Sequence, residues 1–563
     1  MMIRYIFFYA FLAVSLIETY AQPQGPAYVV KFANKNNSPY TINNPSAFLS
    51  PAALNRRLSQ GIAIDPGDLP VTPSYIEAIT QAGAQIAAVS RWFNTAAVWI
   101  NNPAIIQTIE AMPFVVSVIS MDSPGKSMTK QDWFNKLLFN EDEALAVPSG
   151  LTSKAVNANY YNYGDAYNQI SMVSGHILHN QGFSGQGMVI AVLDAGFRRV
   201  DVNPVFDSLR LENRILGSRD FVQPGNNVYN PNIHTHGTNV LSIMAANISG
   251  QMVGTAPKAS YWLLRTEDAL AEYLMEEYYW VAGAEFADSV GAWVINSSLG
   301  YTTFDNPYQN HTYAHMNGNT APSTRGGDIA ASKGILVINS AGNSGLDSWY
   351  YIGAPADGDS VLAIGAVNAS GIYATFSSKG PSSDGRVKPD VSAQGQGTTI
   401  SNSLGTITSG SGTSFSSPVV AGVAACLWQT NLNRTNMQVA QSIKKSSSQY
   451  NNPDAFLGYG IPDFQLASLL LRKADDSVND SKITTSVFPN PFNDFFWVST
   501  FGLSNSILIV RISDATGKNM LVREASGQSN YLKVDGLSHL GSVLYIIHVT
   551  TSSGTATRKL LKF

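Results

Sequence analysis

Long apolar runs recur through the middle of the chain and predict the strands of a buried parallel sheet. Four such runs, each of four to six residues, occupy residues 188–193, 292–295, 335–338 and 361–364. A strand that is covered by helices on both faces reads as a continuous apolar run rather than as an alternating one. Residues 166–471 therefore predict a doubly wound α/β domain.

Polar residues stand directly after three of these runs and mark the carboxyl edge of the predicted sheet. They are Asp194, Asn296 and Asn339. Open α/β sheets bind ligands in the crevice outside the carboxyl ends of their strands. The pattern therefore places the candidate site of this domain at that edge.

Two smaller modules are predicted on either side of the α/β domain. Residues 22–125 alternate short strand-like runs with helical stretches, which indicates an α+β module with a core of its own. Residues 483–563 return as short strands between turn signals, which is typical of a small β-sandwich. Polar segments at 126–165 and 472–482 are expected to connect the three modules.

In the first module, the pattern of apolar positions sets the expected elements. The expected strands are 28–32, 86–89, 96–100 and 114–119, and the expected helices are 51–60, 73–81 and 103–112.

Residues 1–21 are typical of a signal peptide. Arg4 supplies a positive start, residues 5–17 are almost wholly apolar, and Ala21 offers a small residue at the cleavage position. A membrane anchor is the alternative, but the run is shorter than the roughly 20 residues that cross a bilayer. We therefore expect export, removal of this segment, and no membrane span thereafter.

Composition narrows the classes of partner. The chain has 563 residues, of which only 13% are charged, and its net charge is −4. This balance gives no basic field for a phosphate backbone, so nucleic acid is excluded as a partner. The one cysteine, Cys426, excludes an internal disulfide and lies in an apolar stretch, where a packed thiol is expected.

Ser414 is the candidate nucleophile because it stands on a Gly-rich turn at the start of a long apolar helix. A serine hydroxyl is almost never ionised near neutral pH, so it needs a base such as a neutral imidazole. His236 begins a helix upstream, and the carboxylate of Asp194 could hold its ring in the useful tautomer. The neighbouring His234 is interpreted as a loop residue.

Two groups could stabilise the negative oxygen that forms during acyl transfer. The N-terminus of the helix after Ser414 presents free N–H groups, and Asn343 offers a side-chain amide. Each candidate alone has an ordinary interpretation as a cap or a turn. Together, at strand ends and helix starts, they favour nucleophilic catalysis.

These motifs give the domain a resemblance to the subtilisin-like serine peptidases. The matching segments are 189–196, 236–240, 298–300, 341–343, 376–380, 388–390 and 412–418. The resemblance implies a triad of Asp194, His236 and Ser414, with Asn343 in the oxyanion hole. It also implies an acyl-enzyme intermediate and no cofactor for the chemistry.

The same resemblance implies two segments that bind substrate. One segment pairs as a strand with the substrate backbone, and the other lines the pocket for the residue before the scissile bond. They comprise Ser298, Leu299 and Gly300, and Ser340, Ala341 and Gly342.

The chain departs from the family pattern at three positions. Ala195 replaces a Ser or Thr that could donate a hydrogen bond to the aspartate, Phe415 replaces a common Met, and Leu241 interrupts a Val-Ala-Gly sequence. None of these changes removes a reacting group, so they bear on rate and pocket shape.

The flanking modules carry resemblances of their own. The first is similar to a subtilisin-type propeptide, which implies a zymogen cut within 126–165; a permanent binding domain is the alternative. The last, with residues 487–491, 512–518 and 558–563, resembles the C-terminal sorting domain of type IX secretion in Bacteroidetes. It implies export to the surface or medium by that machinery; a carbohydrate- or peptide-binding module is the alternative.

Two further functional classes stay open at this point: a surface-binding protein on an inactive subtilisin-like fold, and a non-peptide acyl hydrolase. The sequence also allows a structural calcium ion at stretches such as 201–203 or 357–359, which are more often plain turns. It names no metal ligand, and it leaves the side-chain preference and the cleavage bond undetermined.

Overall fold

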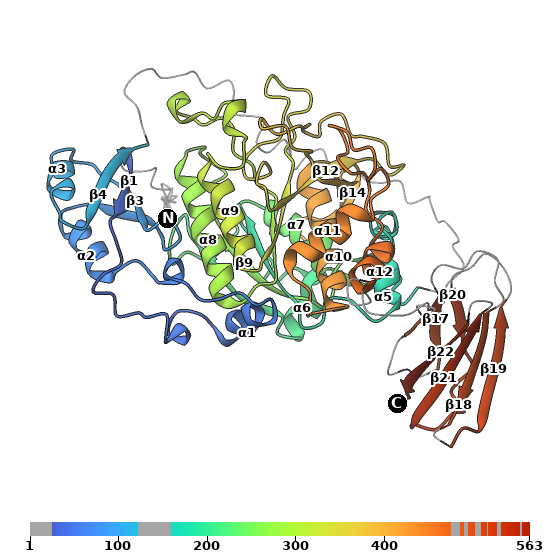
Figure 1. The fold of residues 1–563 in the computed structure, drawn as a ribbon. Coiled ribbons are helices and arrows are strands. Elements are labelled where there is room, and N and C mark those ends of the chain that lie inside the picture. The colour runs from blue at the N-terminus through green and yellow to red at the C-terminus, as the bar shows by residue number, and fades with distance from the viewer. Residues whose placement is uncertain are drawn as a thin grey trace, which may run out of the picture.

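The computed structural model describes residues 25–121 and 159–473, and residues 485–562 apart from 489–491, 493, 501–507, 515, 526–530 and 552–553. The expected signal peptide, most of the expected connector at 126–165 and the connector at 472–482 beyond residue 473 lie outside these residues. The chain forms an N-terminal module, a large central domain and a strand-rich C-terminal module (Figure 1).

The N-terminal module is a four-stranded antiparallel sheet in the order β2-β3-β1-β4. Its strands are β1 Ala27–Phe32, β2 Gln85–Ser90, β3 Thr95–Trp99 and β4 Val115–Ser120. Its helices are α1 Pro51–Ser59, α2 Pro73–Gln81 and α3 Ile105–Glu110. One face of the sheet packs with α2 and α3 into a separate core that includes Val30, Ile79 and Ile109. The predicted α+β module with its own core is therefore present.

The central domain holds a seven-stranded sheet in the order β13-β12-β11-β10-β5-β9-β6, and all its pairings are parallel. The strands are β5 Val189–Asp194, β6 Ile215–Asp220, β9 Ser260–Arg265, β10 Val294–Ser297, β11 Leu336–Ser340, β12 Val361–Val367 and β13 Val391–Gln394. The four apolar runs correspond to β5, β10, β11 and β12, which lie next to one another. The predicted doubly wound fold is confirmed.

Helices cover both faces of this sheet (Figure 1). Helices α8 Met275–Val290 and α9 Pro322–Ser332 pack on one face, and α7 His236–Ala245 and α10 Thr413–Gln429 pack on the other. Every residue of α10 from Thr413 to Trp428 is buried, as expected for a helix that is apolar on all sides. Outer helices α11 Asn436–Lys445 and α12 Phe464–Lys473 pack against α10.

Shorter elements complete the central domain. They are α4 Tyr167–Ser171, α5 Gly175–Asn180, α6 Asp207–Leu211, β7 Asn247–Ile248, β8 Met252–Val253, β14 Thr398–Ser401 and β15 Ile407–Gly410.

The central domain begins earlier in the chain than the sequence indicated. Tyr163 is buried with its hydroxyl 2.8 Å from Nδ1 of His179, and the amide of Asp165 donates to the carbonyl of Gln251. Residues 159–165, assigned from the sequence to a connector, therefore lie on the central domain.

The C-terminal module consists of two antiparallel sheets that share one core. The first contains β16 Thr485–Phe488, β17 Phe496–Thr500 and β20 Tyr531–Val534, and the second contains β18 Leu508–Ser513, β19 Asn519–Ala525, β21 Leu544–Thr551 and β22 Gly554–Leu561. Buried side chains from both sheets, such as Val498 and Ile547, meet between them. This arrangement is the small sandwich that the turn pattern predicts.

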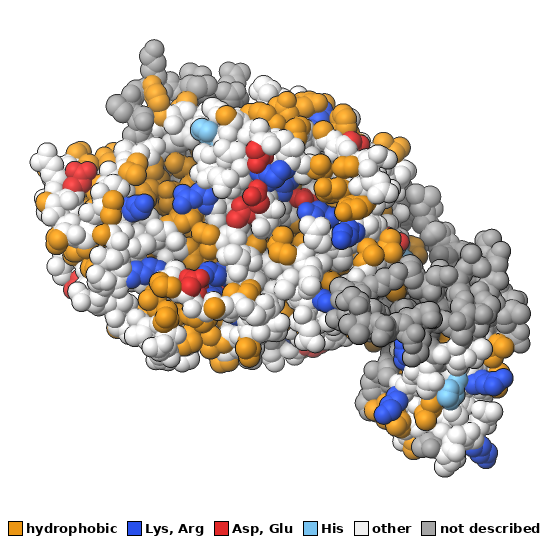
Figure 2. All heavy atoms as spheres, viewed as in Figure 1, with side chains coloured by type: hydrophobic (Ala, Val, Ile, Leu, Met, Phe, Trp, Pro, Cys, Tyr) orange, Lys and Arg blue, Asp and Glu red, His pale blue; other side chains and the backbone are white. Residues whose placement is uncertain are grey.

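Three further predictions from the sequence concern membrane spans, surface charge and the cysteine. Among the described residues, no helix has the length and apolar character needed to cross a bilayer. Figure 2 shows acidic and basic side chains interspersed on the visible face rather than gathered in a basic field. Cys426 is buried in α10, and burial raises the pKa of its thiol, so the group stays protonated and unreactive.

The burial of α10 leads to a stability prediction. Replacing Leu427, which is fully buried in α10, by Ala should lower the free energy of unfolding by about 2–5 kcal/mol because a cavity remains. The matched change Leu211→Ala, at a residue 82% exposed, should cost less than about 0.5 kcal/mol. Denaturant unfolding followed by tryptophan fluorescence measures both, and equal losses would contradict the central placement of α10.

Candidate active site

Asp194 and His236 come from two elements that meet at the carboxyl edge of the sheet. Asp194 is the last residue of β5, and His236 is the first residue of α7. Nδ1 of His236 lies 2.8 Å from Oδ1 of Asp194, and both side chains are buried. The same carboxylate oxygen accepts a hydrogen bond from the amide of Ala195 at 2.8 Å. The amide of Ala195 therefore orients the Asp194 carboxylate, and the carboxylate in turn orients the imidazole of His236.

Gly237 explains how the two elements can approach so closely. A Cβ atom at this position would lie 2.4 Å from the carbonyl oxygen of Gly196 and 3.0 Å from Cβ of Asp194. Contacts this short do not occur in folded proteins, so a larger residue would push the start of α7 away from β5. The His-Gly sequence thus has a packing reason that the sequence analysis did not identify.

Ser414 lies in the first turn of α10, beside the histidine. The ring of the next residue, Phe415, is 6.1 Å from the ring of His236 between centroids. The Ser414 hydroxyl donates to the carbonyl oxygen of Ser298 at 3.3 Å, and Nε2 of His236 has no hydrogen-bond partner among the described residues. In this conformation the Ser414 hydroxyl is therefore hydrogen-bonded to Ser298 and not to the imidazole, while the turn that carries Ser414 contacts the imidazole through Phe415.

Asn343 is held with its amide nitrogen toward the same corner. Its Oδ1 accepts hydrogen bonds from the backbone N and the Oγ1 of Thr413, at 2.8 and 2.9 Å. A Cβ atom placed on Gly412 would lie 3.6 Å from Nδ2 of Asn343 and 3.8 Å from the backbone N of Ser414. Nδ2 of Asn343 and the backbone N of Ser414 therefore both lie near Gly412, at the start of α10.

The two predicted binding segments lie on either side of this corner. The Oγ of Ser298 donates to the carbonyl of Ser414 at 2.9 Å, and Gly300 is exposed. The amide of Asn339 donates to the carbonyl oxygens of Leu299 and Ser340, at 2.9 and 2.8 Å. One side chain thus fixes the spacing between the segments.

The second of these segments is tied down in turn. The amide of Ala341 donates to the carbonyl of Ile364 on β12 at 2.9 Å. The amide of Gly342 donates to Oγ1 of Thr413 at 3.2 Å. The segment is thereby joined both to the sheet and to the first turn of α10.

His234 lies apart from these contacts. Its Nδ1 accepts a hydrogen bond from the backbone N of His236 at 3.2 Å. Burial, with the nearby His236, lowers the pKa of His234 to about 4, so its ring is neutral at neutral pH. The ring can therefore accept that hydrogen bond at the start of α7.

The three departures from the family pattern occupy buried positions. The second carboxylate oxygen of Asp194 is buried and has no hydrogen-bond partner among the described residues, and Ala195 has no hydroxyl to offer it. Phe415 and Leu241 are fully buried and belong to the core that α7 and α10 share.

In the two stretches considered for calcium, side-chain oxygen atoms accept hydrogen bonds from backbone amides. Oδ1 of Asn203 accepts from the amide of Val205 at 3.0 Å. The buried carboxylate of Asp357 accepts from the amide of Gly318 at 2.9 Å, and burial raises its pKa. A third group, not noticed in the sequence, is formed by the carboxylates of Glu267, Glu272 and Glu276, whose candidate ligand atoms lie within 4.8 Å of one another.

Comparison with known families gives a match for each module. The Subtilase family matches residues 185–460. The Peptidase S8 propeptide domain of Bacteroidota matches residues 27–136, and the Secretion system C-terminal sorting domain matches residues 486–562. The two flanking resemblances and the central one are thereby confirmed.

Two subtilisins among the relatives agree with this assignment. Subtilisin E from Bacillus subtilis (strain 168) is 33% identical over 302 residues, which cover 53% of this chain and 70% of the relative. Subtilisin from Bacillus pumilus is 33% identical over 302 residues, covering 53% of this chain and 97% of the relative. The crystal structure of MycP1 from Mycobacterium smegmatis aligns with a TM-score of 0.41 at 20% identity, covering 56% of this chain and 86% of that one.

The sorting domain indicates export by type IX secretion to the cell surface or the medium. The propeptide domain indicates synthesis as a zymogen. With these flanking domains, the chain belongs to the subtilase family and is a secreted serine-type endopeptidase.

Proposed function

We propose that the enzyme hydrolyses peptide bonds of extracellular proteins through Asp194, His236 and Ser414 and an acyl-enzyme intermediate. The observation that carries the proposal is the buried contact of 2.8 Å between Asp194 and Nδ1 of His236. It leaves Nε2 as the nitrogen that can take a proton, on a ring that lies beside the turn of Ser414.

The chemistry follows from this arrangement. The hydroxyl of Ser414 turns from the carbonyl of Ser298 to Nε2 of His236, gives up its proton and attacks the amide carbon. Catalytic hydrogen bonds are often absent or long in free enzymes and form with substrate bound. The imidazolium is stabilised by Asp194 and then protonates the leaving amine, after which water releases the acyl group by the same route.

Asn343 and the backbone N–H of Ser414 would stabilise the oxyanion. Both nitrogen atoms lie within 4 Å of a Cβ built on Gly412, and the Oδ1 of Asn343 is already held by Thr413. A donor that is fixed before the reaction needs no reorganisation when charge develops on the oxygen.

The segment Ser298–Gly300 would receive the backbone of an extended substrate. It follows β10 directly, lies outside the strands of the sheet and contains an exposed glycine. An extended peptide can add to such a segment by backbone hydrogen bonds, which favours polypeptides over simple esters. Residues Ser340–Gly342 would then line the pocket for the side chain before the scissile bond.

We further propose the boundaries and partners that the sequence indicated. The propeptide spans 22–125, the catalytic domain 166–471 extended by residues 159–165, and the sorting domain 483–563. The enzyme's own propeptide, the type IX secretion machinery and polypeptide substrates are its partners. The chemistry needs no cofactor because the chain supplies nucleophile, base and donors, and a structural calcium ion stays a proposal from sequence.

Removing the nucleophile tests the function directly. Ser414→Ala should lower peptidase activity about 10³-fold or more, because only the binding and oxyanion groups remain. Ser411→Ala, at an exposed serine on the preceding turn, should keep its activity. Fluorescent casein turnover and fluorophosphonate labelling measure the effect, with circular dichroism as the check of folding. Full activity in the Ser414→Ala enzyme would refute the triad.

A second variant tests the oxyanion donor. Asn343→Ala should lower kcat about 10²–10³-fold with little change in KM, since the lost hydrogen bond forms only in the transition state. Steady-state kinetics on a chromogenic peptide separate the two constants. A rise in KM at unchanged kcat would instead assign Asn343 to ordinary substrate binding.

A third variant tests the approach of α7 to β5. Gly237→Ala should lower kcat/KM about tenfold to a hundredfold, because displacing a catalytic group by about 1 Å has an effect of this size. Gly541→Ala, where a Cβ would meet nothing within 4 Å, is the control. Wild-type kinetics in Gly237→Ala would show that the contact with β5 does not position His236.

A further inference from the structure

Helix α1 of the N-terminal module lies across the ends of α8 and α9, far from the catalytic edge (Figure 1). Helix α8 starts after β9, at the carboxyl edge, and ends before β10, at the amino edge. Its 16 residues span about 24 Å. The contacts of α1 are therefore separated from Ser414 by roughly the thickness of the domain.

Glycines at the ends of both helices allow α1 to come very close. Gly291 ends α8 with φ +85°, and a Cβ there would lie 2.6 Å from Cβ of Ala52 in α1. Gly334 follows α9 with φ +88°, and a Cβ there would lie 2.7 Å from Nε2 of Gln60. Glycine is favoured at both positions by backbone conformation, and here it also opens the surface to α1.

Donors from the α1 segment bind the carbonyl groups at these two helix ends. The amide of Ser50 donates to Ser289 at 2.8 Å, and Nε2 of Gln60 donates to Gly334 at 2.8 Å. The guanidinium of Arg56 donates to Ala292 at 2.5 Å and to Lys333 at 3.2 Å. Helix C-termini carry partial negative charge, so a cation is stabilised there.

Asp288 adds a full negative charge to the same surface. It accepts from Arg56 at 2.5 Å, from Arg57 at 2.7 Å and from Arg91 at 2.6 Å, and it is fully buried. Arg57 also forms a paired contact with Asp68 of its own module, at 2.8 and 2.9 Å. We call Asp288, with the carbonyl groups of residues 289, 292, 333 and 334, the helix-end surface.

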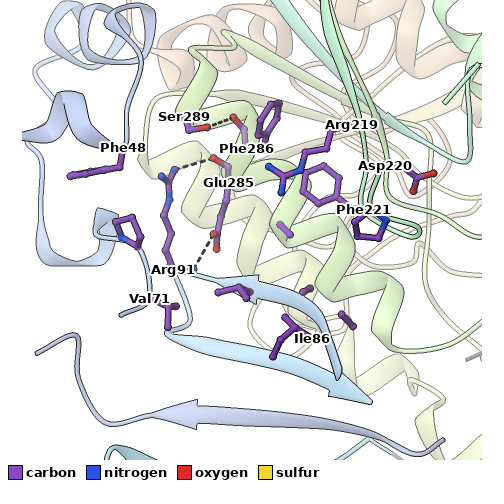
Figure 3. A pocket seen from close by; sticks show the side chains of 16 residues that line it. Phe48, Val71, Ile86, Arg91, Arg219, Asp220, Phe221, Glu285, Phe286 and Ser289 are labelled. Atoms are coloured by element: carbon purple, nitrogen blue, oxygen red, sulfur yellow. Dashed lines mark hydrogen bonds between the residues drawn. The ribbon is translucent and has the colours of Figure 1, made fainter. Parts of the chain in front are cut away.

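The two modules also share an apolar contact, since buried residues of β1, β2 and β3 belong to the same apolar cluster as residues of α8. A cavity of about 460 Å³ lies beside Arg91, and Figure 3 shows Phe48, Val71 and Ile86 on one side and Phe286 on the other. Arg91 crosses this region to donate to the carbonyl of Glu285 at 2.9 Å. The charged contacts of Asp288 therefore act in addition to the apolar packing between the modules.

We propose that the helix-end surface is a binding site for the Arg56–Arg57 segment that holds the propeptide on the catalytic domain after the connecting chain is cut. The site acts independently of the cleft, because it lies at the opposite edge of the sheet. The consequence for latency rests on the proposed function: while α1 stays bound, the propeptide is retained beside the active site. Loss of the Asp288 contacts, rather than cutting of the connector alone, then sets the time of release.

The test uses the full chain with Ser414→Ala, so that it does not cleave itself, and with a recognition sequence for a site-specific protease inserted after residue 145. After cutting with that protease, the N-terminal fragment should stay bound to the remainder through dilution and gel filtration. Asp288→Asn should raise koff of the fragment about 30-fold to 1,000-fold, because truncating one member of a buried charge pair acts mainly on koff. An unchanged koff would overturn the proposal.

Two controls keep the result specific. Glu212→Gln removes a half-exposed carboxylate that pairs with Lys258 on the catalytic domain, and it should leave koff unchanged. If the Asp288→Asn chain does not fold, Arg57→Gln makes the same test without altering the catalytic domain, with Lys31→Gln, an exposed cation of the same module, as its control. Equal koff values for Arg57→Gln and Lys31→Gln would also overturn the proposal.

Failure of this inference can be told apart from failure of the proposed function. The dissociation measurement uses the Ser414→Ala chain and needs no activity. In the chain with Ser414 intact, fluorophosphonate labelling after removal of the propeptide reports the triad alone. Labelling together with an unchanged koff would reject the role of the helix-end surface and keep the peptidase.

Discussion

The close approach of α7 to the end of β5 is the contact on which the geometry of the candidate active site depends. It brings His236 within 2.8 Å of Asp194 and requires that residue 237 has no side chain. The strand fixes the carboxylate because β5 lies inside the sheet, paired on both sides by β9 and β10. Two side chains that are 42 residues apart in sequence are thereby positioned by two rigid elements.

The two edges of the sheet use opposite ends of helices. At the carboxyl edge, the N-terminus of α10 presents N–H groups beside Ser414, where the proposed mechanism places the negative charge of acyl transfer. At the amino edge, the C-termini of α8 and α9 present carbonyl groups, which bind the guanidinium of Arg56. The same domain thus has helix N–H groups at the proposed oxyanion site and helix carbonyl groups at the site that binds the propeptide arginine.

The sequence predicted the elements whose signal is local. The apolar runs at β5, β10, β11 and β12 identified the sheet because a strand buried on both faces has no polar position. Asp194, His236 and Ser414 stood out because each lies at the start or end of such an element, and Asn343 because it lies in the loop that follows β11. The end of the first connector was placed too late, because the burial of Tyr163 depends on His179, a contact between segments that only the fold brings together.

Contacts between distant residues could not be predicted from one sequence. Asp288 looks like an ordinary acidic residue near the end of a helix, and its three arginine partners are about 200 residues away. Two sets of hydrogen bonds likewise leave no local pattern in the sequence. The Asn339 amide donates to the carbonyls of Leu299 and Ser340, and Thr413 donates to Oδ1 of Asn343. Such residues become visible only when the chain is folded.

The position of α1 also bears on how the catalytic domain forms. Helices α8 and α9 are the crossovers that lead into β10, which pairs with β5, and β11, which pairs with β10. Parallel pairing is slow because it needs contacts that are distant in sequence. In the folded chain, the N-terminal module binds the ends of both crossovers through Arg56 and Gln60. The surface that retains the propeptide is therefore also suited to guide the assembly of the sheet.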